Sequence, residues 1–163
     1  MSDLEDTLDA LMGALDFPMF IVTAAAGAQR AGCLVGFATQ CSISPFRFLV
    51  CLSDKNRTLR IASSSQALAV HFPTDCAREL VELFGEQTGD DLDKFARCRW
   101  RPGPGGLPIL EDCPRWLAGR VIERLALGDH WGFVLEPFAA EDHGRDESFS
   151  FQQARGLDPG HEA

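Results

Sequence analysis

The sequence has no long apolar run. None of its stretches reaches the roughly 18 consecutive apolar residues that a membrane-spanning helix needs. The first residues are acidic, without the cationic segment that opens a signal peptide. We therefore expect a soluble, cytoplasmic protein that contacts no membrane.

Paired metal-binding motifs are also missing. The six cysteines include no C-x-x-C pair, and no histidine follows them at a finger-like spacing. We expect free, mostly buried thiols in a reducing compartment and no metal site. Cys41 is the exception, because it lies in a polar stretch where it could touch a ligand.

Signatures of nucleophilic and nucleotide-binding enzymes do not occur. The chain contains no G-x-S-x-G, no G-x-G-x-x-G and no P-loop. His71 falls within an apolar segment, which favours a structural, hydrogen-bonded histidine, while His143 and His161 lie in an acidic tail. Any catalysis must therefore draw on something other than a protein nucleophile or a metal.

The negative charge is concentrated at the two ends. The formal charge is −9, and residues 1–16 hold five acids and no Lys or Arg. Residues 141–163 carry a net −4, so the stretch 17–140 is neutral. Net acidity disfavours nucleic-acid binding, but the neutral middle permits a local cationic pocket for a small phosphorylated ligand.

The pattern of apolar residues predicts one mainly β domain. With 163 residues, 15 Gly and nine Pro, the chain has the length of one domain and many turns. The first three predicted strands are joined by short links and should form an antiparallel meander. We predict an antiparallel β-barrel with inserted helices, whose strands are Met19–Ala24, Ala31–Ala38, Phe46–Leu52, Ala67–Phe72, Leu107–Leu110, Trp116–Leu127 and Trp131–Glu136.

Both ends are predicted to differ from this domain, which spans 17–140. Leucines at helical spacing predict an amphipathic helix over Asp3–Leu15, within residues 1–16. We expect it to pack on its own sheet; the alternative is a helix that binds a partner. Residues 141–163 form an acidic tail that we expect to be mostly disordered. Phe149 and Phe151 could dock onto the domain.

Two polar loops flank the strand Phe46–Leu52. Together they hold small donors and two cations just before a predicted short helix at Thr58–Ser64, a combination that favours an anion. The alternative is a solvated turn with a capping threonine. The candidate ligand-binding residues are Thr39, Gln40, Cys41, Ser42, Ser53, Lys55, Asn56, Arg57 and Thr58.

Gly128-Asp129-His130 separates two apolar strands. It can be a tight turn in which the aspartate holds the backbone. It can also place His130 at the mouth of a pocket, where imidazole can accept a proton.

In order, these pieces resemble the flavin reductase-like, FMN-binding split-barrel family, which contains the small reductase components of two-component flavin monooxygenases. The resemblance covers roughly Phe17–Phe138. Its pieces are A-G-C-L-V-G-F-A-T-Q-C-S-I-S-P from Ala31, F-L-V-C-L-S-D-K-N-R-T from Phe48, Ile61–Phe72, D-L-D-K-F from Asp91, G-L-P-I-L from Gly106, W-L-A-G-R-V from Trp116 and G-D-H from Gly128.

The resemblance implies a split β-barrel homodimer that reduces FMN, or alternatively FAD, with NADH or NADPH and supplies a partner monooxygenase. It implies that the loop Thr39–Ser44 contacts the flavin ring and that Ser53–Thr58 holds the phosphate. It also implies that His130 is the catalytic residue and, with Asp129, contacts the nicotinamide. A non-reductase FMN-binding electron-transfer or flavin-storage protein is the alternative. Where the family commonly has Pro-Pro this chain has Pro45-Phe46; this and other departures leave FMN or FAD open.

Overall fold

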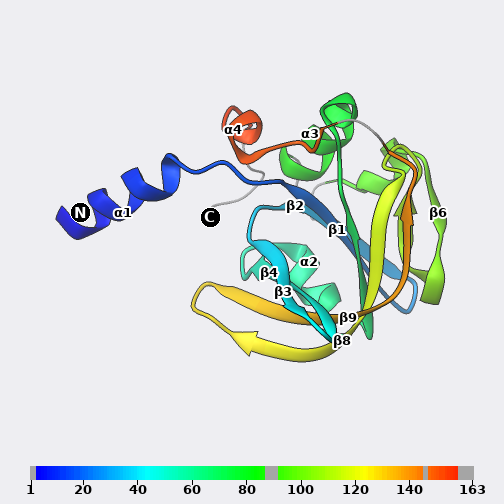
Figure 1. The fold of residues 1–163 in the computed structure, drawn as a ribbon. Helices are drawn as coiled ribbons and strands as arrows, with labels where there is room; N and C mark the ends of the chain where they lie inside the picture. The colour runs from blue at the N-terminus through cyan, green and yellow to red at the C-terminus, as the bar shows by residue number, and fades with distance from the viewer. Residues whose placement is uncertain (1–2, 87–91, 145–146, 158–163) are drawn as a thin grey trace.

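The computed structural model describes residues 3–86, 92–144 and 147–157 (Figure 1). Seven strands form one antiparallel sheet in the order β2-β1-β5-β8-β9-β4-β3, and a small β6-β7 pair lies beside it. The mainly β prediction is confirmed. The edge strands β2 and β3 do not pair with each other in the described residues, so the sheet curls without closing. The strands are β1 Phe20–Ala26, β2 Gln29–Val35, β3 Ala38–Ile43, β4 Phe46–Ser53, β5 Ala67–His71, β6 Trp100–Pro102, β7 Pro108–Leu110, β8 Arg115–Ala126 and β9 His130–Asp142.

The predicted polar loop Thr39–Ser44 is a strand for most of its length. β3 pairs with β4, with a register shift between Gln40 and Ser42. The predicted meander is also wrong, because the chain passes from β2 to the opposite edge of the sheet before β4 begins. β3 is largely exposed on both faces, so its sequence lacks the apolar alternation by which a half-buried strand is recognised.

The core lies on both faces of the curled sheet. Inside the curl, α2 (Arg57–Ala62) buries Ile61 and Ala62 against strands β1, β2, β4, β5 and β9. Outside it, α3 (Arg78–Glu86) buries Leu80, Val81 and Phe84 on β1 and β2. Short 3-10 helices complete the fold, namely η1 Asp75–Ala77, η2 Lys94–Arg97 and η3 Pro104–Gly106.

The N-terminal helix does not pack on its own sheet. α1 (Asp3–Gly13) has no buried residue and projects from the body in Figure 1. Its apolar face is open to solvent, with Leu4 66% and Leu11 56% exposed. The helix itself was predictable from leucine spacing, whereas the prediction of its packing partner is wrong for this chain.

The C-terminal tail is more ordered than predicted. β9 continues to Asp142, Phe149 is buried, and Phe151 begins the short helix α4 (Phe151–Ala154). The predicted docking of both phenylalanines is therefore confirmed, and the predicted disorder is wrong for 147–157. Residues 145–146 and 158–163 lie outside the described residues. No helix in the described residues has the length and apolar character needed to cross a membrane.

His71 is the structural histidine that the sequence predicted. It is fully buried; its Nδ1 donates to the Ile21 carbonyl at 3.0 Å, and its Nε2 accepts from the Leu110 N–H at 3.1 Å. The two bonds require a neutral ring with the proton on Nδ1. Burial lowers the pKa of His71 to about 4, although the bond to Ile21 opposes the shift.

We predict that the free energy of unfolding depends on His71 below neutral pH. The pKa is lower in the folded than in the unfolded protein, so the stability that neutral His71 confers is present above pH 6.5 and is lost as the pH falls towards 4. The wild type should lose about 2 kcal/mol through this group between pH 7 and pH 5 in urea titrations. His71→Gln should lose less over the same interval, while the exposed control His143→Gln should match the wild type. Equal pH dependence in His71→Gln and wild type would contradict the account.

Candidate functional site

Ser53, Asn56 and His130 line one mostly apolar cavity of about 510 Å³, here called the apolar cavity. Its floor is the end of β2 and the link that follows, from Cys33 to Phe37. Register brings the polar residues together, because β4 pairs with β9 so that Ser53 lies opposite His130. Residues 77 positions apart in the sequence therefore meet at one end of the β4–β9 ladder.

His130 is fixed from two sides. Its Nδ1 lies 2.7 Å from the Asp129 carboxylate, and its ring centroid lies 5.1 Å from that of Phe37. The hydrogen bond from His130 lowers the pKa of Asp129. Gly128 adopts a φ of 131°, which favours glycine, in the turn where the Leu127 N–H donates to the His130 carbonyl. Gly128-Asp129-His130 is therefore a tight turn, and the histidine that ends it lines a cavity.

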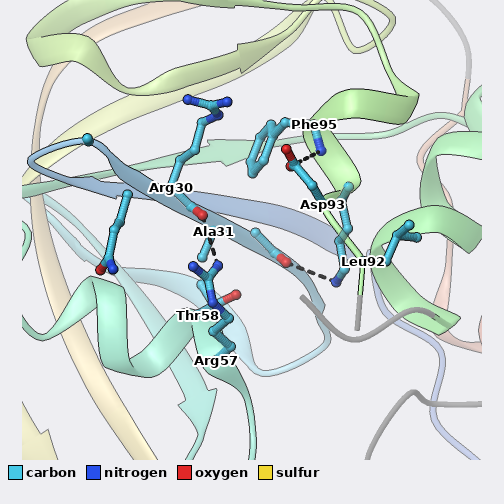
Figure 2. A pocket seen from close by; sticks show the side chains of 11 residues that line it. Arg30, Ala31, Arg57, Thr58, Leu92, Asp93 and Phe95 are labelled. Carbon is cyan, nitrogen blue, oxygen red and sulfur yellow. Dashed lines mark hydrogen bonds between the residues drawn. The ribbon is translucent and has the colours of Figure 1, made fainter. Parts of the chain in front are cut away.

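A second cavity, of about 430 Å³, adjoins the first and is here called the cationic cavity (Figure 2). Arg57 donates from Nη1 to the Arg30 carbonyl at 3.0 Å. Lys94 donates from Nζ to the Gly32 carbonyl at 3.1 Å and to the Phe84 carbonyl at 3.2 Å. Gly32 lines this cavity and Cys33, the next residue of β2, lines the apolar cavity, so the two cavities are neighbours along this strand.

Sequence reasoning missed Arg30 and Lys94. Lys94 is only 4% exposed, and burial lowers the pKa of its ammonium group; Cys33 opposes that shift and Arg57 adds to it. Lys94 stood in the D-L-D-K-F piece of the resemblance, but nothing in its own surroundings distinguished it from a surface lysine. The closeness of β2 to η2 is visible only in the fold.

The start of α2 does not present its N–H groups as predicted. Asn56 is the N-cap, and its side chain accepts from the Thr58 N–H at 2.9 Å. Thr58 is 1% exposed, and its side chain hydrogen-bonds Cys33. Thr58 thus holds α2 to β2, and Asn56 rather than a threonine caps the helix.

The remaining predicted residues are spread over other surfaces. Thr39 and Gln40 line a separate apolar hollow beside Phe37. Cys41 is exposed on β3, Ser42 is half-buried, and neither lines the two cavities. Lys55 lies in the β4–α2 turn, where its N–H donates to Ser53 Oγ at 3.2 Å. The structure brings together Ser53, Asn56 and His130, with Arg57 and Thr58 next to them.

The C-terminal segment forms one wall of the apolar cavity. Phe151, Arg155 and Leu157 line it, and the Phe151 ring stacks on Phe17 at 4.6 Å between centroids. Arg155 also donates to the Gly13 carbonyl at 3.3 Å, which ties this wall to the end of α1. Apart from the predicted docking of Phe149 and Phe151, no pattern in the sequence predicts this wall.

Comparison with known proteins places this arrangement in a family. The flavin reductase like domain matches residues 12–157, and the chain belongs to that family. It is 30% identical over 110 residues to FMN reductase (NADH) RutF from Enterobacter cloacae, covering 68% of this chain and 66% of that protein. It is 25% identical over 136 residues to diflavin flavoprotein A 1 from Synechocystis, covering 80% of this chain and 23% of that protein.

The fold is shared with solved structures. NADH:FAD oxidoreductase SgcE6 from Streptomyces globisporus superposes with a TM-score of 0.84 at 20% identity, covering 95% of this chain and 94% of that one. The chain spans 24% and 40% of two other curated relatives, so much of those proteins has no counterpart in it. The resemblance drawn from the sequence is confirmed at the level of family and fold.

We predict that Asn56 stabilises the chain as a helix cap. Asn56→Ala removes the acceptor of the Thr58 N–H and should lower the free energy of unfolding by about 1 kcal/mol. Asn56→Asp keeps an acceptor oxygen and should stay within a few tenths of a kcal/mol of wild type. Urea denaturation at neutral pH measures both. Equal free energies of unfolding for the Ala and Asp variants would show that the Asn56 side chain does not stabilise the helix as a cap.

Proposed function

We propose that the chain is an NAD(P)H-dependent flavin reductase that transfers a hydride from NADH or NADPH to FMN or FAD. The observation that carries the proposal is the meeting of His130, Ser53 and Gly36–Phe37 in one apolar cavity that has a cationic cavity beside it. The relative named FMN reductase (NADH) and the fold neighbour named NADH:FAD oxidoreductase support it.

The donors and shape of the apolar cavity fit a flat, mostly apolar ring with a polar edge. A Cβ on Gly36 would lie 3.3 Å from both Met19 Sδ and Phe17 Cε2, so the backbone there is approached closely. Ser53 and Asn56 supply polar groups where the apolar cavity meets Arg57 and the cationic cavity. We assign the ring to Gly36–Phe37 and the phosphate to the junction at Arg57. This shifts the ring from the sequence-based Thr39–Ser44 to the preceding link.

The protein contributes position and charge. A bound flavin would supply the hydride-accepting ring. The Asp129 carboxylate accepts from Nδ1 of His130, so the other ring nitrogen is the one available to the cavity. That nitrogen can orient the carboxamide of a nicotinamide or balance charge near the ring. Apolar side chains from β2 and the C-terminal segment line the same space.

The test of the function is flavin-dependent oxidation of NADH or NADPH by the purified chain. We predict that His130→Ala lowers kcat or raises the nicotinamide KM at least tenfold, because an orienting group is lost. The flavin Kd should change less than threefold. His143→Ala, exposed and outside both cavities, is the matched control.

Two results would count against this proposal. Absence of flavin-dependent oxidation with either nicotinamide would remove the reductase function and favour a flavin-storage or electron-transfer protein, provided that flavin still binds. A loss confined to flavin affinity in His130→Ala would place the histidine in flavin binding alone.

We further propose that the chain acts as a homodimer and passes reduced flavin to a partner monooxygenase. Apolar side chains remain uncovered on α1 and near the β3–β4 turn, including Leu8 (47% exposed), Ile43 (85%) and Phe46 (41%). A second copy would cover surfaces of this kind. The fold neighbour titled nitrilotriacetate monooxygenase component B, at a TM-score of 0.77, supports the reductase-partner arrangement.

We predict that the apolar face of α1 contributes to the dimer. Leu8→Ser with Leu11→Ser should shift the mass in analytical ultracentrifugation towards the monomer and raise the dimer Kd at least tenfold. Thr7→Ser on the same helix is the control. A wild-type chain that is monomeric at micromolar concentration would contradict the dimer, and an unchanged dimer in the leucine variant would exclude α1 from its interface.

A further inference from the structure

The N-terminal helix α1 and the C-terminal helix α4 hold each other beside the apolar cavity. Neither helix contains a buried residue. The matched family domain begins at residue 12, so most of α1 lies outside it. Elements with few buried apolar contacts open locally at a low free energy. The position of each helix therefore depends on the contacts between them.

Gln152 is at the centre of these contacts. Its side-chain Nε2 donates to the Gly13 carbonyl at 3.1 Å and to the Leu15 carbonyl at 2.5 Å. Its backbone N–H donates to Asp16 Oδ1 at 3.0 Å. The last carbonyls of a helix have no partner within it, so these bonds satisfy groups that α1 leaves open. We call the bonds from Gln152 to these three residues the Gln152 clasp.

Arg155 adds charge to the clasp. Its Nη1 donates to Gln152 Oε1 at 3.0 Å and to the Gly13 carbonyl at 3.3 Å. The last turn of α1 has no basic residue of its own. A cation near the C-terminal end of a helix is stabilising, and the Arg155 guanidinium supplies that cation from the other end of the chain.

The clasped segment is also the C-terminal wall of the apolar cavity. Phe151, Ala154, Arg155 and Leu157 line the cavity on this side, whereas Gln152 does not line it. The wall residues lie directly before and after Gln152 in the sequence. Loss of the clasp would therefore loosen the wall against which a ligand in this cavity packs.

We propose that the Gln152 clasp links α1 to the flavin cavity, so that covering the apolar face of α1 by the second copy tightens flavin binding. The inference rests on the proposed reductase function and on the proposed dimer. It makes Gln152 a positioning residue, which acts on bound flavin through the wall residues.

The link follows from the fraction of molecules in which the wall is in place. The apparent Kd equals the intrinsic Kd divided by the fraction of molecules that are competent to bind. In a single chain Leu8 and Leu11 are exposed, and no described residue buries any part of α1. A second copy that covers these leucines would fix α1 and, through the clasp, α4 and the wall. By thermodynamic reciprocity, flavin would strengthen the dimer by the same factor.

A double-mutant cycle on flavin affinity tests the link. Leu8→Ser with Leu11→Ser leaves α1 without its apolar face, and Gln152→Ala breaks the clasp; none of these residues lines either cavity. Each change should raise the flavin Kd about fivefold, and all together should also raise it about fivefold instead of about 25-fold. The control is Glu147→Gln, an exposed residue of the same segment that lines neither cavity.

The measurement is flavin fluorescence titration with FMN and with FAD, at a chain concentration just above the wild-type dimer Kd. The kcat at saturating flavin should stay within about twofold of wild type in Gln152→Ala, because the wall is in place once flavin is bound. Gln152→Lys restores a donor to the same carbonyls and should return the flavin Kd to within about twofold of wild type.

Several results would overturn the link. Effects that multiply to about 25-fold would show that α1 and Gln152 act independently. An unchanged flavin Kd in the leucine variant or in Gln152→Ala would remove one end of the link, and a Lys variant as weak as the Ala variant would remove the donor role of Gln152.

Failure of the proposed function is distinguished by the wild type, which then binds neither FMN nor FAD. Hydrogen exchange of the chain without flavin still tests the clasp in that case. Gln152→Ala should speed exchange of the Phe151 amide, which donates to the Phe17 carbonyl at 2.8 Å, at least about tenfold. Unchanged exchange would show that the clasp does not hold the wall.

Discussion

The edge of β2 that pairs with no strand in the described residues is the constraint around which both cavities are built. β2 pairs only with β1, so the carbonyls of Arg30 and Gly32 point away from the sheet. Unpaired backbone N–H and C=O groups at a sheet edge can pair with a strand of another chain unless other groups bind them. Arg57 and Lys94 cover them by side-chain hydrogen bonds. The same bonds bring two positive charges to the strand along which the proposed flavin lies.

A second constraint closes the site at the other end of the strand. The β4–β9 ladder sets Ser53 opposite His130, and the Asp54 N–H donates to the Asp129 carbonyl at 2.9 Å. The glycine turn before His130 can therefore move little without breaking the ladder. In this way the β4–β9 ladder holds a polar pair beside the apolar end of β2, which suits a ligand that is flat at one end and charged at the other.

Local chemistry determined what could be predicted. Apolar periodicity located most strands, and the apolar surroundings of His71 marked it as structural. β3 was missed because its small polar residues are exposed on both faces. The packing of α1 was predicted wrongly because none of the described residues buries any part of it. Lys94 was missed because its role depends on a β2 carbonyl 62 residues away, a contact that no local pattern encodes.

The most direct test of the groove along β2 is a crystal structure of the chain with FAD. The account predicts the flavin ring against Gly36–Phe37 and beside His130, and the phosphate beside Arg57. A ring lying instead on β3, between Thr39 and Ser42, would contradict it. So would a phosphate that lies away from Arg57.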